Sequence, residues 1–201
     1  MSTAVPPAWA DAVLRLVLAA EHRETVSGDL LEAYRDSICP ARGQTAADRW
    51  YVIQVLGFVW RSQWVWALVL GVTTVARTGF DWLSPPADFH TRATISTVVG
   101  VTTFSCAGLW AARRSRSVAS GALAGLVTAV MGAIVSIAGA ALLFAVWHDD
   151  RTLSAIAGSG GLAEVFTLPV MLCLPGVVLG TVGGVVGGLA WGTEKTTLIR
   201  N

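Results

Sequence analysis

Long apolar stretches alternate with short charged segments along this chain. Residues 1–49 mix charged side chains with apolar ones at helical spacing, and four largely uncharged stretches follow, at about residues 61–80, 93–112, 119–147 and 167–191. Each stretch reaches the roughly 20 apolar residues that a helix needs to cross a bilayer. The pattern therefore predicts an all-α integral membrane protein. Residues 1–49 would form a cytoplasmic helical prefix, and residues 50–201 would form a four-helix transmembrane bundle.

The prefix pattern predicts amphipathic helices. Residues 8–20 place Trp9, Val13 and Leu16 on one face, and the charge-dense residues 21–36 keep Val26, Leu30 and Tyr34 four apart. A break at Gly28, with Asp29 and Glu32 at the spacing of a capping box, would divide the second segment, so one helix and two helices both remain open.

The connections between these elements are also predicted from the pattern. Cys39, Pro40 and Gly43 indicate a turn, and a third helix is expected to start at Thr45 or Asp48 and to continue past Arg61 into the first span. Residues 78–92 are expected to be a loop, and the glycine-rich residues after His148 a flexible linker. Pro175 predicts a kink in the fourth span.

The fourth span carries a glycine at every fourth position: Gly176, Gly180, Gly184, Gly188 and Gly192. In water each glycine would weaken a helix by about 1 kcal/mol relative to alanine, but in lipid the backbone stays helical and small residues let another helix approach closely. A four-residue step overshoots a full turn by ~40°, so one straight partner cannot contact all five glycines.

Small residues in the third span suggest the partner of this row. Gly121 and Gly125 form one row there, and Gly132 belongs to another. Because consecutive spans run in opposite directions, we expect Gly121 and Gly125 to lie opposite Gly184, Gly188 and Gly192. The end of the row at Gly176 and Gly180 would then face another span or another subunit.

Composition and charge narrow the functional classes. Apolar residues make up 54% of the chain and charged residues 13%, about half the usual share for a soluble domain. The net charge of +1 gives no support for nucleic-acid binding. Cys39, Cys106 and Cys173 are scattered and match no metal or redox spacing.

Basic residues predict the orientation. With the amino terminus inside the cell, all but Arg77, Arg92 and Arg151 of the fourteen Lys and Arg residues lie on the cytoplasmic side. Both termini are therefore expected to be cytoplasmic. Aromatic and basic residues expected at the membrane interface are Trp50, Tyr51, Arg61, Arg113, Arg114 and Arg116.

No pattern of catalytic residues is present. The sequence has no P-loop, HExxH or nucleophile-elbow motif, so we expect no enzyme activity and no cofactor. The polar residues Asp88, His90, His148, Asp149 and Asp150 have ligand chemistry, but nothing sets their spacing, and whether the two segments meet is open. We expect no metal site.

Residues 21–56 carry a resemblance to a known family. The residues involved are Arg23-Glu24, the core Gly28-Asp29-Leu30-Leu31-Glu32-Ala33-Tyr34-Arg35, then Asp48-Arg49-Trp50-Tyr51 and Gln54-Val55-Leu56. This segment resembles the permease prefix region that precedes bacterial FtsX-type ABC-transporter permeases associated with PadR-type regulators. The family commonly has another acid in place of Ala33 and an arginine in place of Ile53. The resemblance implies a small relative without the large extracytoplasmic domain.

The resemblance also implies a function and a location. A partner would dock on Gly28, Asp29, Glu32, Tyr34 and Arg35. The favoured hypothesis is that the protein is a non-catalytic accessory or interaction subunit in the bacterial inner membrane. It would contact the lipid bilayer and a permease or another membrane protein. The alternatives are a small homo-oligomeric transporter or channel, and a membrane sensor that signals to a cytoplasmic regulator.

Overall fold

All regular elements that the structure describes are helices. The computed structural model describes residues 5–84, 90–158 and 161–198, with side chains described as far as residue 189. Four segments are long and apolar enough to cross a membrane: Gln44–Leu83, His90–Ser115, Val118–Val146 and Gly161–Leu189. The prediction of an all-α membrane protein with four spans is confirmed, and the chain is a multi-pass membrane protein.

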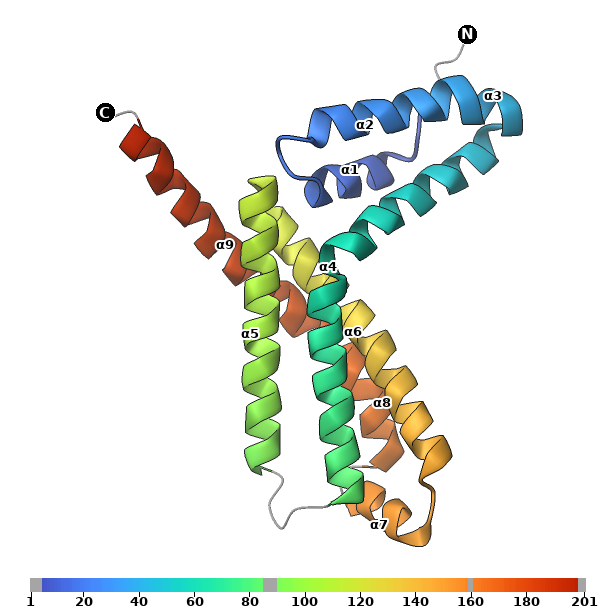
Figure 1. Cartoon of the computed structure of the whole chain (residues 1–201), viewed down its shortest axis with the longest axis vertical. Helices are drawn as coiled ribbons and strands as arrows, with labels where there is room; N and C mark the ends of the chain where they lie inside the picture. Colours follow the sequence, from blue (N-terminus) through green and yellow to red (C-terminus); the bar gives the residue numbers. More distant parts are fainter. Residues whose placement is uncertain (1–4, 85–89, 159–160, 199–201) are drawn as a thin grey trace.

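The prefix is a helical hairpin at one end of the bundle. Helix α1 (Ala8–Val17) lies beside a second stretch made of α2 (Arg23–Glu32), the π-helix η1 (Ala33–Ile38) and α3 (Cys39–Arg42) (Figure 1). This stretch continues through Gly28, which answers the question of one helix or two. The turn predicted over residues 39–43 is shorter than expected, because α3 continues to Arg42 and the chain turns at Gly43, whose φ is 79°. Pro40 lies in the first turn of α3, where a missing N–H is tolerated.

One helix, α4 (Gln44–Leu83), joins the prefix to the bundle. The predicted boundary between residues 49 and 50 falls inside α4, and Figure 1 shows that α4 bends between its prefix half and its bundle half. The hydroxyl of Ser62 donates to the Val59 carbonyl over 2.8 Å, a bond to the preceding turn that often bends helices. The prefix and the first span therefore share a continuous backbone.

The second and third spans are the helices α5 (His90–Ser115) and α6 (Val118–Val146). Arg116, with φ 58°, makes the tight turn between them. The loop predicted over residues 78–92 is too long, since α4 reaches Leu83 and α5 starts at His90. Asp88 lies outside the described residues.

A short helix replaces part of the expected flexible linker. This helix, α7 (Asp150–Gly158), follows the third span, so the segment expected as a flexible linker is in part helical. The Asp149 carboxylate accepts hydrogen bonds from the N–H (3.3 Å) and the hydroxyl of Thr152 and so caps the helix. The Thr152 hydroxyl bond holds the pKa of Asp149 below its ordinary value.

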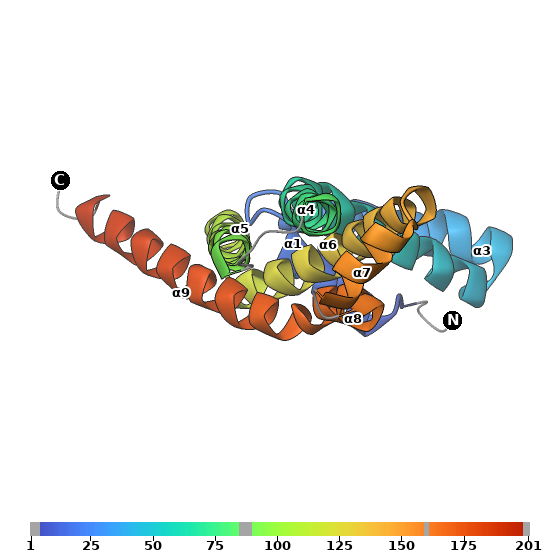
Figure 2. The same cartoon turned by 90° about the horizontal axis from the view of Figure 1, so that it is seen from below.

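The fourth span is divided into α8 (Gly161–Met171) and α9 (Cys173–Leu198). The interruption is at Leu172, close to the kink predicted from Pro175. Pro175 has no N–H to bond the Met171 carbonyl four residues earlier, and its ring crowds that carbonyl. Helix α9 then crosses α5 and α6, and its carboxyl-terminal part extends away from the bundle (Figure 2).

Candidate functional site

Two buried tyrosines hold the prefix together. The rings of Tyr34 and Tyr51 pack edge to face, with centroids 5.9 Å apart. The Tyr34 hydroxyl donates to the Asp48 carboxylate over 2.6 Å, and the Tyr51 hydroxyl donates to Asp11 over 3.2 Å. Burial, followed by the Asp48 hydrogen bond, raises the pKa of Tyr34 to about 12.

These positions correct two predictions. Tyr34 is fully buried, so it does not lie on an exposed docking face, and Tyr51 is fully buried in the prefix core, so it does not face the membrane interface. The spacing of Val26, Leu30 and Tyr34 already placed Tyr34 on the apolar side of its helix. Trp50 is half-buried against the same core.

The other four predicted docking residues are exposed. Gly28, Asp29, Glu32 and Arg35 are accessible on α2 and η1, and apart from the local helix backbone no atom lies within 4 Å of the place where a Cβ of Gly28 would be. We call these four residues the prefix surface. Gly28, Glu32 and Arg35 are spaced by four and three residues, which places them on one side of the helical stretch.

The prefix is bonded to the turn between α5 and α6. The Ala20 N–H donates to the Arg114 carbonyl over 3.1 Å, and Nη2 of Arg23 donates to the Ser115 carbonyl over 2.7 Å. Both carbonyls belong to the last turn of α5, whose carbonyls have no partner inside the helix. The contact joins residues 92 positions apart, and no local pattern in the sequence predicts it.

The basic residues predicted at the membrane interface lie on α4 and at the carboxyl-terminal end of α5. Arg61, Arg113, Arg114 and Arg116 are all exposed. Arg113 and Arg114 lie in the last turn of α5, and Arg116 lies in the turn that follows it. Their contact with lipid headgroups stays a prediction.

The glycine row of α9 packs on α6, as predicted, but in a different register. A Cβ at Gly125 would overlap the Gly176 carbonyl oxygen, and a Cβ at Gly121 would lie 2.6 Å from the Gly180 carbonyl oxygen and 2.8 Å from Cα of Gly184. Gly121 and Gly125 therefore lie opposite Gly176, Gly180 and Gly184 instead of Gly184, Gly188 and Gly192, a shift of about two helical turns from the expected position. The backbones of α6 and α9 touch at these five glycines, and we call this contact the glycine seam.

Three of the predicted packing glycines lie outside this seam. A Cβ at Gly188 would meet only the Val118 side chain, at an ordinary 3.5 Å. Gly132 faces Leu70 of α4, where a Cβ would lie 2.7 Å from Cδ2. The surroundings of Gly192 lie outside the described side chains.

A second glycine row of α9 faces α5 and was missed in the sequence. A Cβ at Gly183 would overlap the Ser105 carbonyl oxygen, and a Cβ at Gly187 would lie 3.0 Å from the Leu109 carbonyl oxygen. Gly108 of α5 abuts the Gly180 backbone in the same way. The adjacent pairs at 183–184 and 187–188 were the available signal, since neighbouring residues face different sides of a helix.

A charged cluster lies at the distal end, by which we mean the end of the bundle away from the prefix. Asp81 is 6% exposed and pairs with Nε of Arg77 at 3.4 Å and with Nη1 of Arg92 at 3.1 Å. Nη1 of Arg77 also donates to the Ser96 hydroxyl over 3.2 Å. The Arg92 guanidinium lies 5.9 Å from the centre of the Phe80 ring.

Asp81 lies on α4, so the prediction that it belongs to a loop is wrong. Asp81 follows Arg77 by four residues on α4, the spacing of a helical ion pair, and this spacing was a signal for the pair. Its second partner, Arg92, comes from α5 across residues that the structure does not describe, so only the fold brings the two together.

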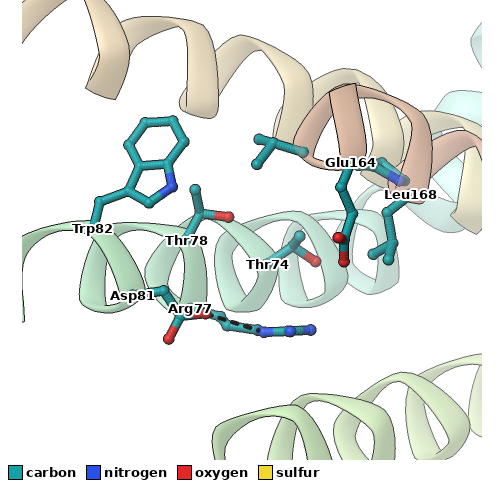
Figure 3. Close-up of a pocket in the computed structure, with 9 residues that line it drawn as sticks. Thr74, Arg77, Thr78, Asp81, Trp82, Glu164 and Leu168 are labelled. Atoms are coloured by element: carbon teal, nitrogen blue, oxygen red, sulfur yellow. Dashed lines mark ion pairs between the residues drawn. The ribbon is translucent and has the colours of Figure 1, made fainter. Parts of the chain in front are cut away.

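Two hollows adjoin the cluster. A small one, of about 50 Å³, lies between α4 and α8, and Glu164 projects into it from α8 (Figure 3). A larger cavity, of about 290 Å³, lies between α4, α5, α8 and α9. Arg77 lines both. Within residues 5–84, 90–158 and 161–189, no three His, Cys, Asp or Glu side chains gather into a metal site.

Comparisons of the chain with protein-family models, with curated proteins and with solved structures found no match. The resemblance to the permease prefix stays a prediction.

Proposed function

We propose that this protein is an accessory or interaction subunit of a permease-like system in the bacterial inner membrane, with a non-catalytic role. Its prefix would dock a cytoplasmic segment of a permease or another membrane protein. The main support for the proposal is that the prefix surface is exposed and that Gly28 leaves space there for a partner to approach the backbone.

The attachment of the prefix supports this role. Arg23 and Ala20 bond the last turn of α5, so a force on the prefix reaches the second and third spans through hydrogen bonds. The prefix also continues into the first span through α4. A docked partner would therefore be coupled to the bundle through two connections.

Site-specific photocrosslinking in cells of the natural host tests the proposal. A photoreactive residue at Glu32, on the prefix surface, is expected to capture a membrane protein other than this chain. The matched control carries the same residue at Ala12, which is exposed on α1 outside the prefix surface. Capture of the same protein at both positions, or of this chain alone at Glu32, would contradict the proposal.

The distal charged cluster favours a second function, a small homo-oligomeric transporter or channel. Charged residues within spanning helices commonly mark solute or ion pathways, and Arg77, Asp81 and Arg92 form such a group. Purified protein in liposomes should then carry a solute or ion, and Arg77→Gln should reduce the flux. Equal, background flux for both proteins across a broad panel of solutes would argue against transport.

A further inference from the structure

The cavity of about 290 Å³ changes in polarity along its length. Its volume is close to the lower limit of roughly 300 Å³ for small-molecule pockets. The polar lining residues Arg77, Ser96 and Thr97 lie toward the distal end of α4 and α5. The apolar residues Leu70, Phe104 and Leu179 lie deeper in the bundle. The cavity therefore matches an amphiphile with its polar group at the distal end.

The polar end has unused capacity for an anion. Arg77 and Arg92 share one carboxylate, that of Asp81, so this group carries a net charge of +1. Arg77 contacts Asp81 through Nε and the Ser96 hydroxyl through Nη1, two of its three donor nitrogens. Glu164 lines the smaller hollow and makes no ion pair with Arg77 in the described part of the chain.

The cavity opens toward lipid. Thr97 and Val101 of α5 and Pro175 of α9 line it and are exposed, so its rim lies on the outer surface of the bundle. Arg77 lies sixteen residues beyond Arg61 on α4, which is about 24 Å along a helix. If Arg61 lies at one membrane surface, Arg77 lies roughly 6 Å inside the opposite edge of a 30 Å hydrocarbon layer, within reach of headgroups.

We propose that this cavity binds one acyl chain of an anionic phospholipid and that Arg77 binds its phosphate. The positive group selects an anionic head, and the guanidinium fork suits phosphate oxygens. The acyl chain would fill the apolar depth between Leu70, Phe104 and Leu179. The site is far from the prefix surface, so the proposal does not depend on the proposed function.

Native mass spectrometry of the protein, extracted from nanodiscs of equal phosphatidylglycerol and phosphatidylcholine, tests the site. We expect one phosphatidylglycerol to remain bound per chain. Arg77→Gln should lower its retention about tenfold, and Arg77→Lys, which keeps the charge, should lower it less. Gly100→Leu should also displace the lipid, because a Cβ there first meets Leu70 at 4.0 Å and the longer side chain fills the cavity.

Two controls separate binding from loss of fold. Arg151→Gln removes an exposed base at the distal end outside this cavity, and Gly57→Leu adds a side chain where no atom lies within 4 Å. Both variants should retain phosphatidylglycerol like the unmodified protein. Equal retention of the two phospholipids, unchanged retention in Gly100→Leu, or displacement of phosphatidylglycerol by equimolar oleate would overturn the proposal.

Discussion

At the scale of single residues, Tyr34 joins the separate parts of the prefix. Its hydroxyl donates to the Asp48 carboxylate on α4 and lies 3.1 Å from the Val5 carbonyl, and it accepts a bond from the Gln44 amide. The side chain is fully buried. The prefix therefore depends on a neutral hydroxyl at this position, since a buried phenolate beside a carboxylate is unfavourable.

Alkaline pH should loosen the prefix. The pKa of Tyr34 is raised from 10.0 to about 12 in the folded protein, so its stabilising contribution is complete below pH 10 and is lost as the pH rises toward 12. The chain has two tyrosines, so tyrosinate absorbance in a Tyr51→Phe variant reports Tyr34 alone. A transition near pH 10 in the folded protein would contradict the prediction, and Tyr34→Phe in this background should remove the signal.

At the scale of elements, glycines determine which helices pack. The backbones of α6 and α9 touch where Gly121 and Gly125 meet Gly176, Gly180 and Gly184, and a second row of α9 faces α5. In lipid the attraction between helices comes largely from such close packing, because lipid tails are as apolar as leucine. Helix α9 is therefore positioned by two glycine rows on two sides.

Alanine substitutions inside and outside the glycine seam should differ in their effect on stability. A methyl group at Gly125 overlaps the Gly176 carbonyl oxygen, and the two backbones must move apart, so Gly125→Ala should lower the free energy of unfolding by about 1–3 kcal/mol. The added methyl group of Gly188→Ala meets only a side chain, at 3.5 Å, so this variant should change the free energy of unfolding by about 0.5 kcal/mol or less. Thermal unfolding in detergent, followed by circular dichroism, compares the two. The opposite order would place the seam elsewhere.

At the scale of the whole molecule, the prefix and bundle form one connected structure. The polar bonds from Ala20 and Arg23 to the end of α5 lie beside the continuous helix α4. The neighbouring Ser115 hydroxyl is buried and bonds Ser120 across the same turn over 2.6 Å. The turn that binds the prefix therefore also holds the second and third spans together.

Removing the Arg23 guanidinium should weaken the attachment of the prefix to the end of α5. Arg23→Met keeps an apolar stem but leaves the Ser115 carbonyl without its donor, so amide hydrogen exchange at residues 18–23 should become faster. Arg15→Met is the control, because the Arg15–Asp11 pair is exposed and such pairs contribute little. Equal exchange in the two variants would show that the Arg23 bond does not hold the prefix.

The charge distribution predicts which face of the membrane the prefix occupies. The chain crosses four times, so the prefix and the end of α9 lie on one side, where most basic residues gather. A membrane-impermeant maleimide should label Ser154→Cys, exposed in α7, in intact spheroplasts of a variant whose other cysteines are serine. Gly28→Cys in the same background should react only after permeabilisation. The reverse pattern would invert the topology.

Local properties of the chain were enough to predict its four spans and the helices of its prefix, but not the short helix α7. Apolar length identified the four spans. Tyr34 was expected on a docking surface, although its helical spacing with Val26 and Leu30 was a signal for the burial that the structure shows. Gly28 and Glu32, expected at the docking surface from the resemblance, are exposed. Burial of backbone polar groups and the helical period act over a few residues, so a sequence reports them directly.

Pairing between distant residues was decided by the tertiary structure. The glycine seam lies about two turns from its expected register, because α8 and α9 divide at Leu172 and α9 crosses α6 on its way out of the bundle (Figure 2). Asp81 became a buried partner of Arg92, and Arg23 reached the end of α5. The sequence by itself determined which segments are apolar and long enough to span a membrane. Only the fold decided which polar groups meet, because those contacts depend on how long helices cross.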